Sequence, residues 1–291
     1  MKTSSRTITI LSILAGLLGL SGALAGLFWP LNGSSFTVTS VHGAQVELWG
    51  QGLYRFDTYF RAPIFRGGDA ITVFIAFPLL VFAIVANAKG SRRGQLLLIG
   101  MLTYFLYNAV SLSFGAAYNQ MLLVYILGFS TSLFALIEAI SSLDKKALAA
   151  SVTSGMPHKA VAIFMFIAGL SVFVWLIDVI NFLVTGQVPE VLATYTTEIT
   201  TVLDIALITP LAYLAGIRML QRKPIGYVVS PIMLFMNTFI GMVVISQTLF
   251  QSAAGISLPP QVLLVYVGTF VVTSIAAITL LILFFRSIRE D

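Results

Sequence analysis

The sequence predicts an all-α integral membrane protein: a bundle of eight transmembrane helices with a small β-hairpin in one extramembrane loop. Three observations predict this class. Of the 291 residues, 58% are hydrophobic and only 9% are charged, against about 25% charged in soluble domains. About eight apolar segments, each long enough to cross a bilayer, alternate with short polar joints. Nearly every Lys and Arg falls in every second joint.

The apolar segments set the expected limits of the spans. We expect a single membrane domain over 1–291, because eight spans of about 20 residues and one loop account for the whole length. The spans are predicted at 8–29, 70–88, 94–116, 119–141, 159–184, 199–217, 225–250 and 262–286.

The first span has two interpretations. Lys2, Arg6, an apolar run and Ala23-Leu24-Ala25 resemble a secretory signal peptide with a cleavage site near residue 25. The apolar run continues to Trp29, which is long for a signal peptide, so we expect a retained span whose small residues suit close helix packing. Cleavage would leave seven spans.

The basic residues predict the orientation. Thirteen of sixteen lie on one side of the predicted membrane, and the other three, Arg55, Arg61 and Arg66, share one loop on the opposite side. By the positive-inside rule, both termini are cytoplasmic in a multi-pass protein of the cell membrane. The net charge of +5 therefore predicts contact with the lipid bilayer and not with nucleic acid.

Several kinds of chemistry are disfavoured by composition. Cysteine is absent, which excludes disulfides and thiolate metal sites. The two histidines, His42 and His158, fall in predicted loops, and no lysine lies inside a span. Haem ligation between helices and a retinal Schiff base are thus excluded. We expect no cofactor, no metal site and no catalytic residue.

The predicted extracytoplasmic loop at 30–68 contains the only expected strands. Alternating apolar residues around His42-Gly43 predict a β-hairpin with a two-residue turn. An aromatic and basic stretch follows, which suits an interfacial belt at the level of the lipid headgroups. The alternative is a lid over a binding site, formed by Tyr54, Arg55, Asp57, Arg61 and Arg66. We expect Asp69 to cap the second span.

The two halves of the chain look related. Pro78-Leu79 precedes Gly94 by the same distance as Pro210-Leu211 precedes Gly226, with basic residues between them in both cases. This spacing favours a four-plus-four duplication with repeats at 1–141 and 159–291. Because four is even, both repeats would run in the same direction across the membrane.

Polar residues inside the spans are the candidate binding residues, because charge in a membrane is expensive. Asp178 and Asp204 fall at matching depth on consecutive spans, where two facing carboxylates could bind a proton or a cation. Their alternative role is to fix helix packing through hydrogen bonds. The other candidates are Asn181, Tyr104, Asn108, Tyr118, Asn237 and Gln247, and they predict an outward-facing polar site.

Several segments resemble a group of bacterial multi-spanning membrane proteins of unknown function. They include Tyr104-Phe-Leu-Tyr107-Asn, Ser113-Phe-Gly-Ala-Ala-Tyr-Asn119, Gly52-Leu-Tyr-Arg-Phe-Asp57 and Phe65-Arg-Gly-Gly-Asp69. The resemblance covers most of the chain from about residue 45. It implies a bacterial plasma membrane and assigns no activity.

Three functions agree with these patterns. A transporter or permease for a small solute or ion fits the polar residues and the prolines in the spans best. A sensor, or an accessory subunit that binds a membrane protein partner through the loop, is the second. A membrane enzyme acting on a lipid is the third and is not our expectation, because no nucleophile or metal motif accompanies the carboxylates.

Overall fold

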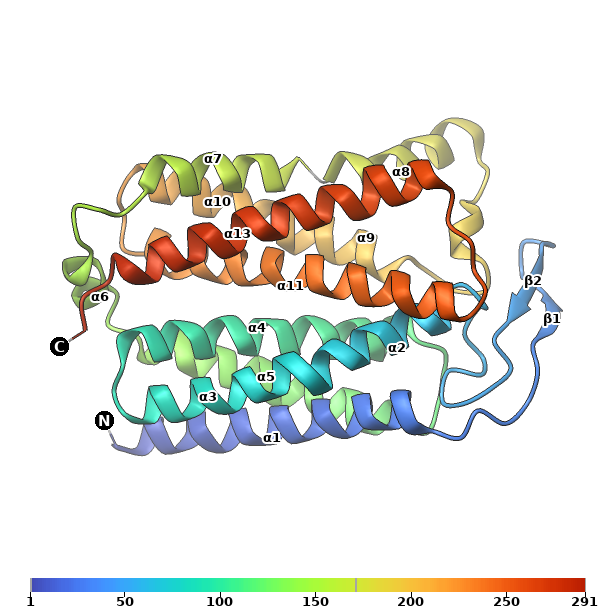
Figure 1. The fold of residues 1–291 in the computed structure, drawn as a ribbon, viewed down its shortest axis with the longest axis horizontal. Coiled ribbons are helices and arrows are strands. Elements are labelled where there is room, and N and C mark those ends of the chain that lie inside the picture. The colour runs from blue at the N-terminus through green and yellow to red at the C-terminus, as the bar shows by residue number, and fades with distance from the viewer. Residues whose placement is uncertain (1, 171, 291) are drawn as a thin grey trace.

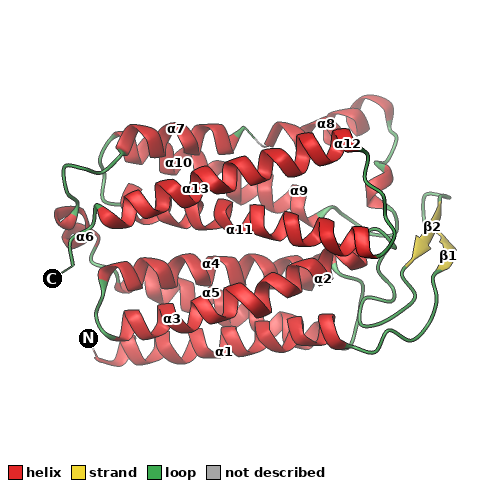
Figure 2. Ribbon diagram, in the orientation of Figure 1, coloured by secondary structure: helices red, strands yellow, loops and turns green. Residues whose placement is uncertain are grey.

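The computed structural model describes residues 2–170 and 172–290, and helices dominate this part of the chain (Figures 1 and 2). Eight helical spans are long and apolar enough to cross a bilayer, as predicted, which indicates a multi-pass protein in a lipid environment. They are Arg6–Phe28, Arg61–Ala88, Arg92–Gly115, Leu122–Ser142, His158–Thr185, Ile199–Leu220, Gly226–Ala253 and Leu263–Arg286.

The second span departs from the predicted limits. Its helix begins at Arg61 and not at residue 70, so residues 61–68 are helical and the predicted loop is shorter. The sequence hides this start because Arg61, Arg66 and two glycines look polar and flexible. In the structure, Thr58 Oγ1 accepts the backbone N–H of Arg61 at 3.1 Å and satisfies one donor of the first turn.

The β-hairpin is confirmed, with a different turn. Strands β1 (Phe36–Thr39) and β2 (Gln45–Leu48) pair antiparallel, with Phe36 opposite Leu48. Ser40 and Ala44 continue the pairing through Ser40 N–H to Ala44 O at 2.8 Å. The turn therefore has three residues, 41–43, and the predicted two-residue turn is wrong. Gly43 supplies the positive φ of 83° that this turn requires.

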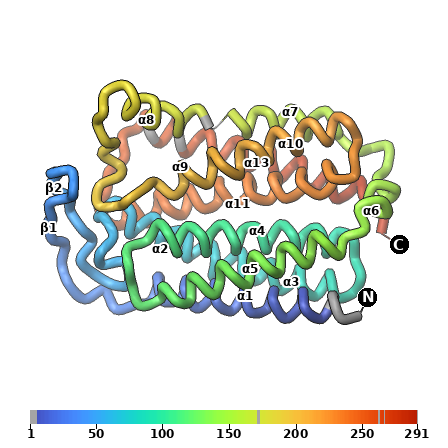
Figure 3. The backbone as a smooth tube through the Cα atoms, turned by 180° about the vertical axis from the view of Figure 1, so that it is seen from behind, coloured from blue at the N-terminus to red at the C-terminus, as the bar shows by residue number. Residues whose placement is uncertain are grey.

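The helices form two groups that lie side by side (Figures 1 and 3). Helix α11 joins the groups by packing against α2 and α4. The first group holds α1 (Lys2–Phe28), α2 (Arg61–Ile71), α3 (Phe77–Ala88), α4 (Arg92–Gly115) and α5 (Leu122–Ser142). The second holds α7 (His158–Gly169), α8 (Val172–Thr185), α9 (Ile199–Leu203), α10 (Thr209–Leu220), α11 (Gly226–Ala253), α12 (Pro260–Val262) and α13 (Gly268–Arg286).

The bundle has two distinct ends (Figure 1). One end carries β1 and β2, and we call it the hairpin end. At the opposite end, which we call the basic end, α1 begins, α13 ends and the short helix α6 (Lys145–Ser151) connects the two groups. The start of α1 and the end of α13 therefore lie on the same side of the bundle, as an even number of spans requires.

Two spans contain a π-helical turn directly before a proline. The turn Thr72–Ala76 precedes Phe77-Pro78 in the second span, and the turn Asp204–Ile208 precedes Thr209-Pro210 in the sixth. Proline has no N–H and its ring collides with the carbonyl four residues earlier. The wider π turn accommodates both effects without ending the helix. A third π turn, Leu263–Val267, opens the eighth span without a proline.

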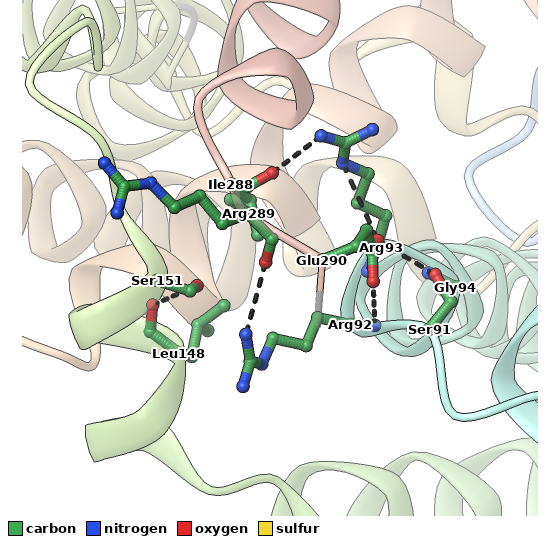
Figure 4. Close-up of polar contacts among 9 residues, drawn as sticks. All are labelled: Ser91, Arg92, Arg93, Gly94, Leu148, Ser151, Ile288, Arg289 and Glu290. Carbon is green, nitrogen blue, oxygen red and sulfur yellow. Dashed lines mark hydrogen bonds and ion pairs between the residues drawn. The ribbon is translucent and has the colours of Figure 1, made fainter.

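At the basic end, the last residues fold back onto α4 (Figure 4). The Glu290 carboxylate accepts hydrogen bonds from Ser91 Oγ, Arg92 N and Arg93 N at 2.9–3.0 Å. It therefore satisfies the free N–H groups at the start of α4, where a negative charge is also favoured by the helix dipole. Burial opposes the charge, but these hydrogen bonds and then Arg93 lower the pKa of Glu290.

Candidate functional site

A fully buried carboxylate that is hydrogen-bonded to a phenol lies at the hairpin end of the first helix group. Asp69 on α2 is 1% exposed, and Tyr54, in the segment before α2, is equally buried. The Tyr54 hydroxyl donates to Asp69 Oδ2 at 2.7 Å. Burial, and then the charge of Asp69, raise the pKa of Tyr54 well above its usual value, so its phenol remains a donor.

Asp69 does not cap the second span, as its position before the apolar run had predicted. At 1.5 Å per residue it lies about 12 Å along the helix from Arg61. Gly26 of α1 lies directly against it: a Cβ there would overlap Asp69 Oδ2 and would lie 2.8 Å from the Tyr54 hydroxyl. The glycine thus lets α1 approach close enough to cover the carboxylate.

Arg66 is the cation whose charge acts on Asp69. Its Nη2 donates to Leu27 O at 3.3 Å, and its Cζ lies 5.4 Å from the centre of the Phe250 ring. The expected position of Arg66 in the loop is wrong, because Arg66 belongs to α2, and its alternative role in a lid stays a prediction. It connects α2 to the end of α1 beside the buried carboxylate.

A second set of polar groups continues from Asp69 toward the middle of the bundle. Thr72, one turn further along the span, hydrogen-bonds the Tyr104 hydroxyl at 2.9 Å, and Asn108 Nδ2 donates to Thr72 Oγ1 at 3.5 Å. The predicted candidates Tyr104 and Asn108 therefore meet at Thr72, a residue that the sequence did not single out. Thr72 begins the π turn that follows α2, and Tyr104 and Asn108 lie on α4.

Asp57 is a second buried carboxylate at the hairpin end, with an exposure of 0%. Its Oδ1 accepts from Ala117 N at 2.8 Å and from the Tyr195 hydroxyl at 3.0 Å. Its Oδ2 is buried and has no hydrogen-bond partner among the described residues. Burial raises the pKa of Asp57 to about 6, although these hydrogen bonds and the charge of Arg61 act in the opposite direction.

Asp57 belongs to a cluster that ties the two helix groups together. Arg61 forms an ion pair with Glu198, the residue before α9, and its Cζ lies 4.3 Å from the centre of the Tyr195 ring. We call Asp57, Arg61, Tyr195 and Glu198 the hairpin-end cluster. Two of the predicted lid residues, Asp57 and Arg61, are buried in this cluster, and Arg61 is part of a helix and not of the loop. Arg55 is exposed, and its guanidinium lies over the Phe56 ring.

Asp204, on the sixth span, accepts hydrogen bonds from one residue of each helix group, and Asp178 is not one of them. Its Oδ1 accepts from the Tyr107 hydroxyl at 3.1 Å and its Oδ2 from Trp175 Nε1 at 2.9 Å. Asp178 and Asn181 are exposed on α8, and no hydrogen bond joins Asp178 to Asp204 among the described residues. The predicted facing carboxylates are therefore replaced by one carboxylate between a tyrosine and a tryptophan.

The other predicted candidates, Tyr118, Asn237 and Gln247, form no hydrogen bond with a carboxylate among the described residues. Tyr118 is 81% exposed. Asn237 is half-buried and donates to Met233 O within its own helix at 2.9 Å. The backbone of Gln247 packs directly on Gly67 where α2 and α11 cross: a Cβ on Gly67 would lie 2.5 Å from Gln247 Cα.

Sequence reasoning missed the pairing of Tyr54 with Asp69. Tyr54 was grouped with the interfacial aromatic residues, and nothing in its spacing places a loop phenol on a carboxylate fifteen positions later. The signal in the sequence was Gly26, because a small residue on the first span predicts close packing of another segment at that position.

Metal binding has no obvious ligand set here. Within residues 2–170 and 172–290, no group of three or more His, Asp or Glu side chains gathers in a way that could hold an ion. Comparison of the chain with protein-family models, with curated proteins and with solved structures finds no match. The geometry of the buried carboxylates is therefore the basis for assigning a function.

Proposed function

We propose that this protein is a membrane transporter that binds a proton or a small cation at Asp69 and Tyr54. The observation that carries the proposal is a fully buried carboxylate that accepts a phenol hydrogen bond, lies near the charge of Arg66 and is covered by a glycine. Burying a charge costs several kcal/mol unless it is paired. A chain that needed only helix packing at this point would be served by an apolar residue.

The surrounding polar groups support a path through this site. The hairpin-end cluster lies on the outer side of Asp69, and Thr72, Tyr104 and Asn108 lie on its inner side. A ligand that reached Asp69 from the hairpin end would pass the ion pair between Arg61 and Glu198. We therefore assign the cluster the role of controlling access to the carboxylate.

Asp204 is the second carboxylate to which we assign a role in transport. Tyr107, which donates to it, lies on α4 one turn from Tyr104, which hydrogen-bonds Thr72. Helix α4 thus contacts the carboxylate-bearing span of each helix group. A role for Asp178, Asn181, Tyr118, Asn237 and Gln247 in solute binding stays a prediction.

A four-plus-four duplication is also part of the proposal, because many transporters are built from repeats. Its support lies in the turn after the second span and the turn after the sixth, which are 132 positions apart. Ser91 N–H bonds to Ala86 O, and Lys223 N–H bonds to Arg218 O. The residue before each donor has a positive φ, 82° at Gly90 and 52° at Arg222.

Further features repeat at the same offset of 132 positions. The π turns begin at Thr72 and Asp204 and precede Pro78 and Pro210. A Cβ on Gly94 would lie 2.6 Å from the Ala86 carbonyl carbon, and one on Gly226 would lie 2.7 Å from that of Arg218. The matched backbone hydrogen bonds and matched close contacts support the proposed duplication beyond the similarity of the apolar segments.

The orientation that we propose follows the charges. Thirteen of the sixteen Lys and Arg residues belong to the predicted cytoplasmic side. The positive-inside rule then puts the basic end and both termini in the cytoplasm and the hairpin end outside the cell membrane. In this orientation Asp69 is reached from the extracytoplasmic side.

The test is ion flux in proteoliposomes. The full chain is reconstituted, a pH gradient or a Na⁺ or K⁺ gradient is imposed, and flux is followed with a pH-sensitive dye and with isotopic uptake. We expect Asp69→Asn to abolish the flux that the wild type shows. We expect Tyr54→Phe to lower it about tenfold, the effect of losing a hydrogen bond to a charged group.

The matched control is Glu47→Gln, which removes an exposed carboxylate on β2. It should leave flux at the wild-type level, because the Glu47 side chain is exposed and forms no hydrogen bond or ion pair with the described residues of the site. Wild-type flux in Asp69→Asn would show that Asp69 is not the binding group.

A further inference from the structure

A small cavity lies between α1, α4 and α5, below the site described above. Its volume is about 10 Å³, close to the smallest size that holds one water molecule. Gly19, Gly22 and Gly128 line this space. The Phe105 ring packs against Gly19 and the Tyr125 ring against Gly22, whereas a Cβ on Gly128 would meet only ordinary contacts. Two polar side chains, Asn108 and Ser132, also line it beside the Tyr125 ring.

The polar side chains that line this cavity have unused hydrogen-bonding capacity within the described chain. Ser132 is 1% exposed, and its Oγ has no hydrogen-bond partner among the described residues. Asn108 uses one N–H toward Thr72 at a long 3.5 Å. A side-chain amide has a second N–H and an oxygen that accepts. A buried hydroxyl left without a partner costs about 1–3 kcal/mol.

We infer that this cavity binds a water molecule that hydrogen-bonds Asn108 and Ser132 and lets a proton continue inward from Asp69. This inference rests on the proposed function and names its ligand as a proton. The polar groups that the water would join are Thr72, Asn108 and Ser132, on three different spans. The water and the Ser132 hydroxyl would each release one proton as they receive another, so nothing is consumed, and the Asn108 amide would position the water without carrying the proton.

The donor set favours water over a metal ion. The polar side chains that line the cavity are neutral, and Ca²⁺ takes six to eight oxygen ligands, several of them carboxylates. A water molecule needs two to four polar partners. The Ser12 hydroxyl of α1 is also fully buried and has no hydrogen-bond partner in the described chain. Ser12 lies three residues before Ala15, which lines the cavity. The polar groups therefore extend further toward the basic end.

Filling the cavity is the direct test. A Cβ on Gly128 meets only ordinary contacts, 3.7 Å to Ala109 Cβ and 3.8 Å to Leu18 Cβ. Gly128→Ala therefore adds a methyl group where the water would lie and removes no polar group. Gly268→Ala is the matched control, because a Cβ there would meet only Leu263 O, at an ordinary contact distance of 3.9 Å, and the residue belongs to the second helix group.

We expect Gly128→Ala and Ser132→Val to lower proton flux in proteoliposomes by about tenfold or more, a barrier increase of about 1.4 kcal/mol. Gly268→Ala should keep the wild-type rate. Wild-type proton flux in both cavity variants would overturn the inference. Flux lost in Asp69→Asn but kept in Gly128→Ala refutes the cavity path alone, whereas flux kept in Asp69→Asn refutes the proposed site.

A second measurement decides the matter if the variants fold poorly. A density map at a resolution that shows ordered water should contain one peak within hydrogen-bonding distance of both Ser132 Oγ and the Asn108 amide. The same map of Gly128→Ala should lack it. A dry cavity in the wild type would contradict the inference whatever the flux measurements give.

Discussion

Replacing Gly26 with alanine perturbs the buried carboxylate without changing any polar group. The new Cβ would overlap Asp69 Oδ2 and lie 2.8 Å from the Tyr54 hydroxyl. Neither neighbour is a flexible chain end that can turn away, because both side chains are fully buried and bonded to each other. The variant must therefore separate α1 from α2 or break the hydrogen bond.

The expected cost follows from three terms. Overpacking of a buried site costs about 1–3 kcal/mol. A buried carboxylate that loses its partner adds about 1–3 kcal/mol. Alanine is favoured over glycine inside a helix by about 1 kcal/mol, which offsets part of the loss. The sum predicts a destabilisation of about 1–5 kcal/mol, or a fall in Tm of about 2–4 °C for each kcal/mol.

The assay is thermal unfolding of the purified protein in detergent, with a double-mutant cycle. Gly26→Ala should lower the Tm in the wild type, and much less in a Tyr54→Phe background, where the hydrogen bond is already absent. Gly68→Ala is the control, since a Cβ at that position of α2 has no heavy atom within 4 Å. A Gly26→Ala protein as stable as Gly68→Ala would refute the close packing of α1 on Asp69.

The remaining predictions concern the other charged groups. The raised pKa of Asp57 means that its contribution to stability is complete below the unfolded value of 3.8 and is lost as the pH rises to about 6. The loss amounts to about 3 kcal/mol, and Asp57→Asn should abolish this dependence in unfolding measured between pH 4 and 7. Arg61→Ala should destabilise the protein by about 3–5 kcal/mol, because it leaves Glu198 partly buried without its cation, and Glu198→Gln should recover part of that loss. Glu290→Gln should increase proteolysis or hydrogen exchange after residue 286, and an unchanged rate would show that the carboxylate does not hold this segment on α4. Asp204→Asn should weaken flux more than Asp178→Asn, since Asp204 is held by two hydrogen bonds and Asp178 is exposed.

Much of the fold was readable from the sequence because the membrane restricts the choices. Long apolar segments must be helices whose backbone groups are satisfied internally. The alternation of charge with apolar length therefore predicted all eight spans, most of their ends and the side of the chain that carries the hairpin. The start at Arg61 escaped prediction because a buried ion pair lets a polar segment continue a helix.

The candidate site was less predictable, because it depends on contacts between distant segments. Asp204 was identified from its depth, but its partners Tyr107 and Trp175 lie on two other spans. The sequence predicts that Asp69 caps the second span, because the residues before it are typical of a loop. The prediction of the hairpin turn was wrong for a local reason. The strands continue to the pair of Ser40 with Ala44, which leaves three residues, including Gly43, in the turn.

The most direct measurement of the central claim is difference infrared spectroscopy of carboxyl groups in the reconstituted protein. Spectra are compared before and after acidification or addition of a cation, in the wild type, in Asp69→Asn and in Glu47→Gln. A carboxyl band that changes in the wild type and in Glu47→Gln, and that is missing in Asp69→Asn, is the predicted result. Identical difference spectra in all three proteins would contradict binding at Asp69.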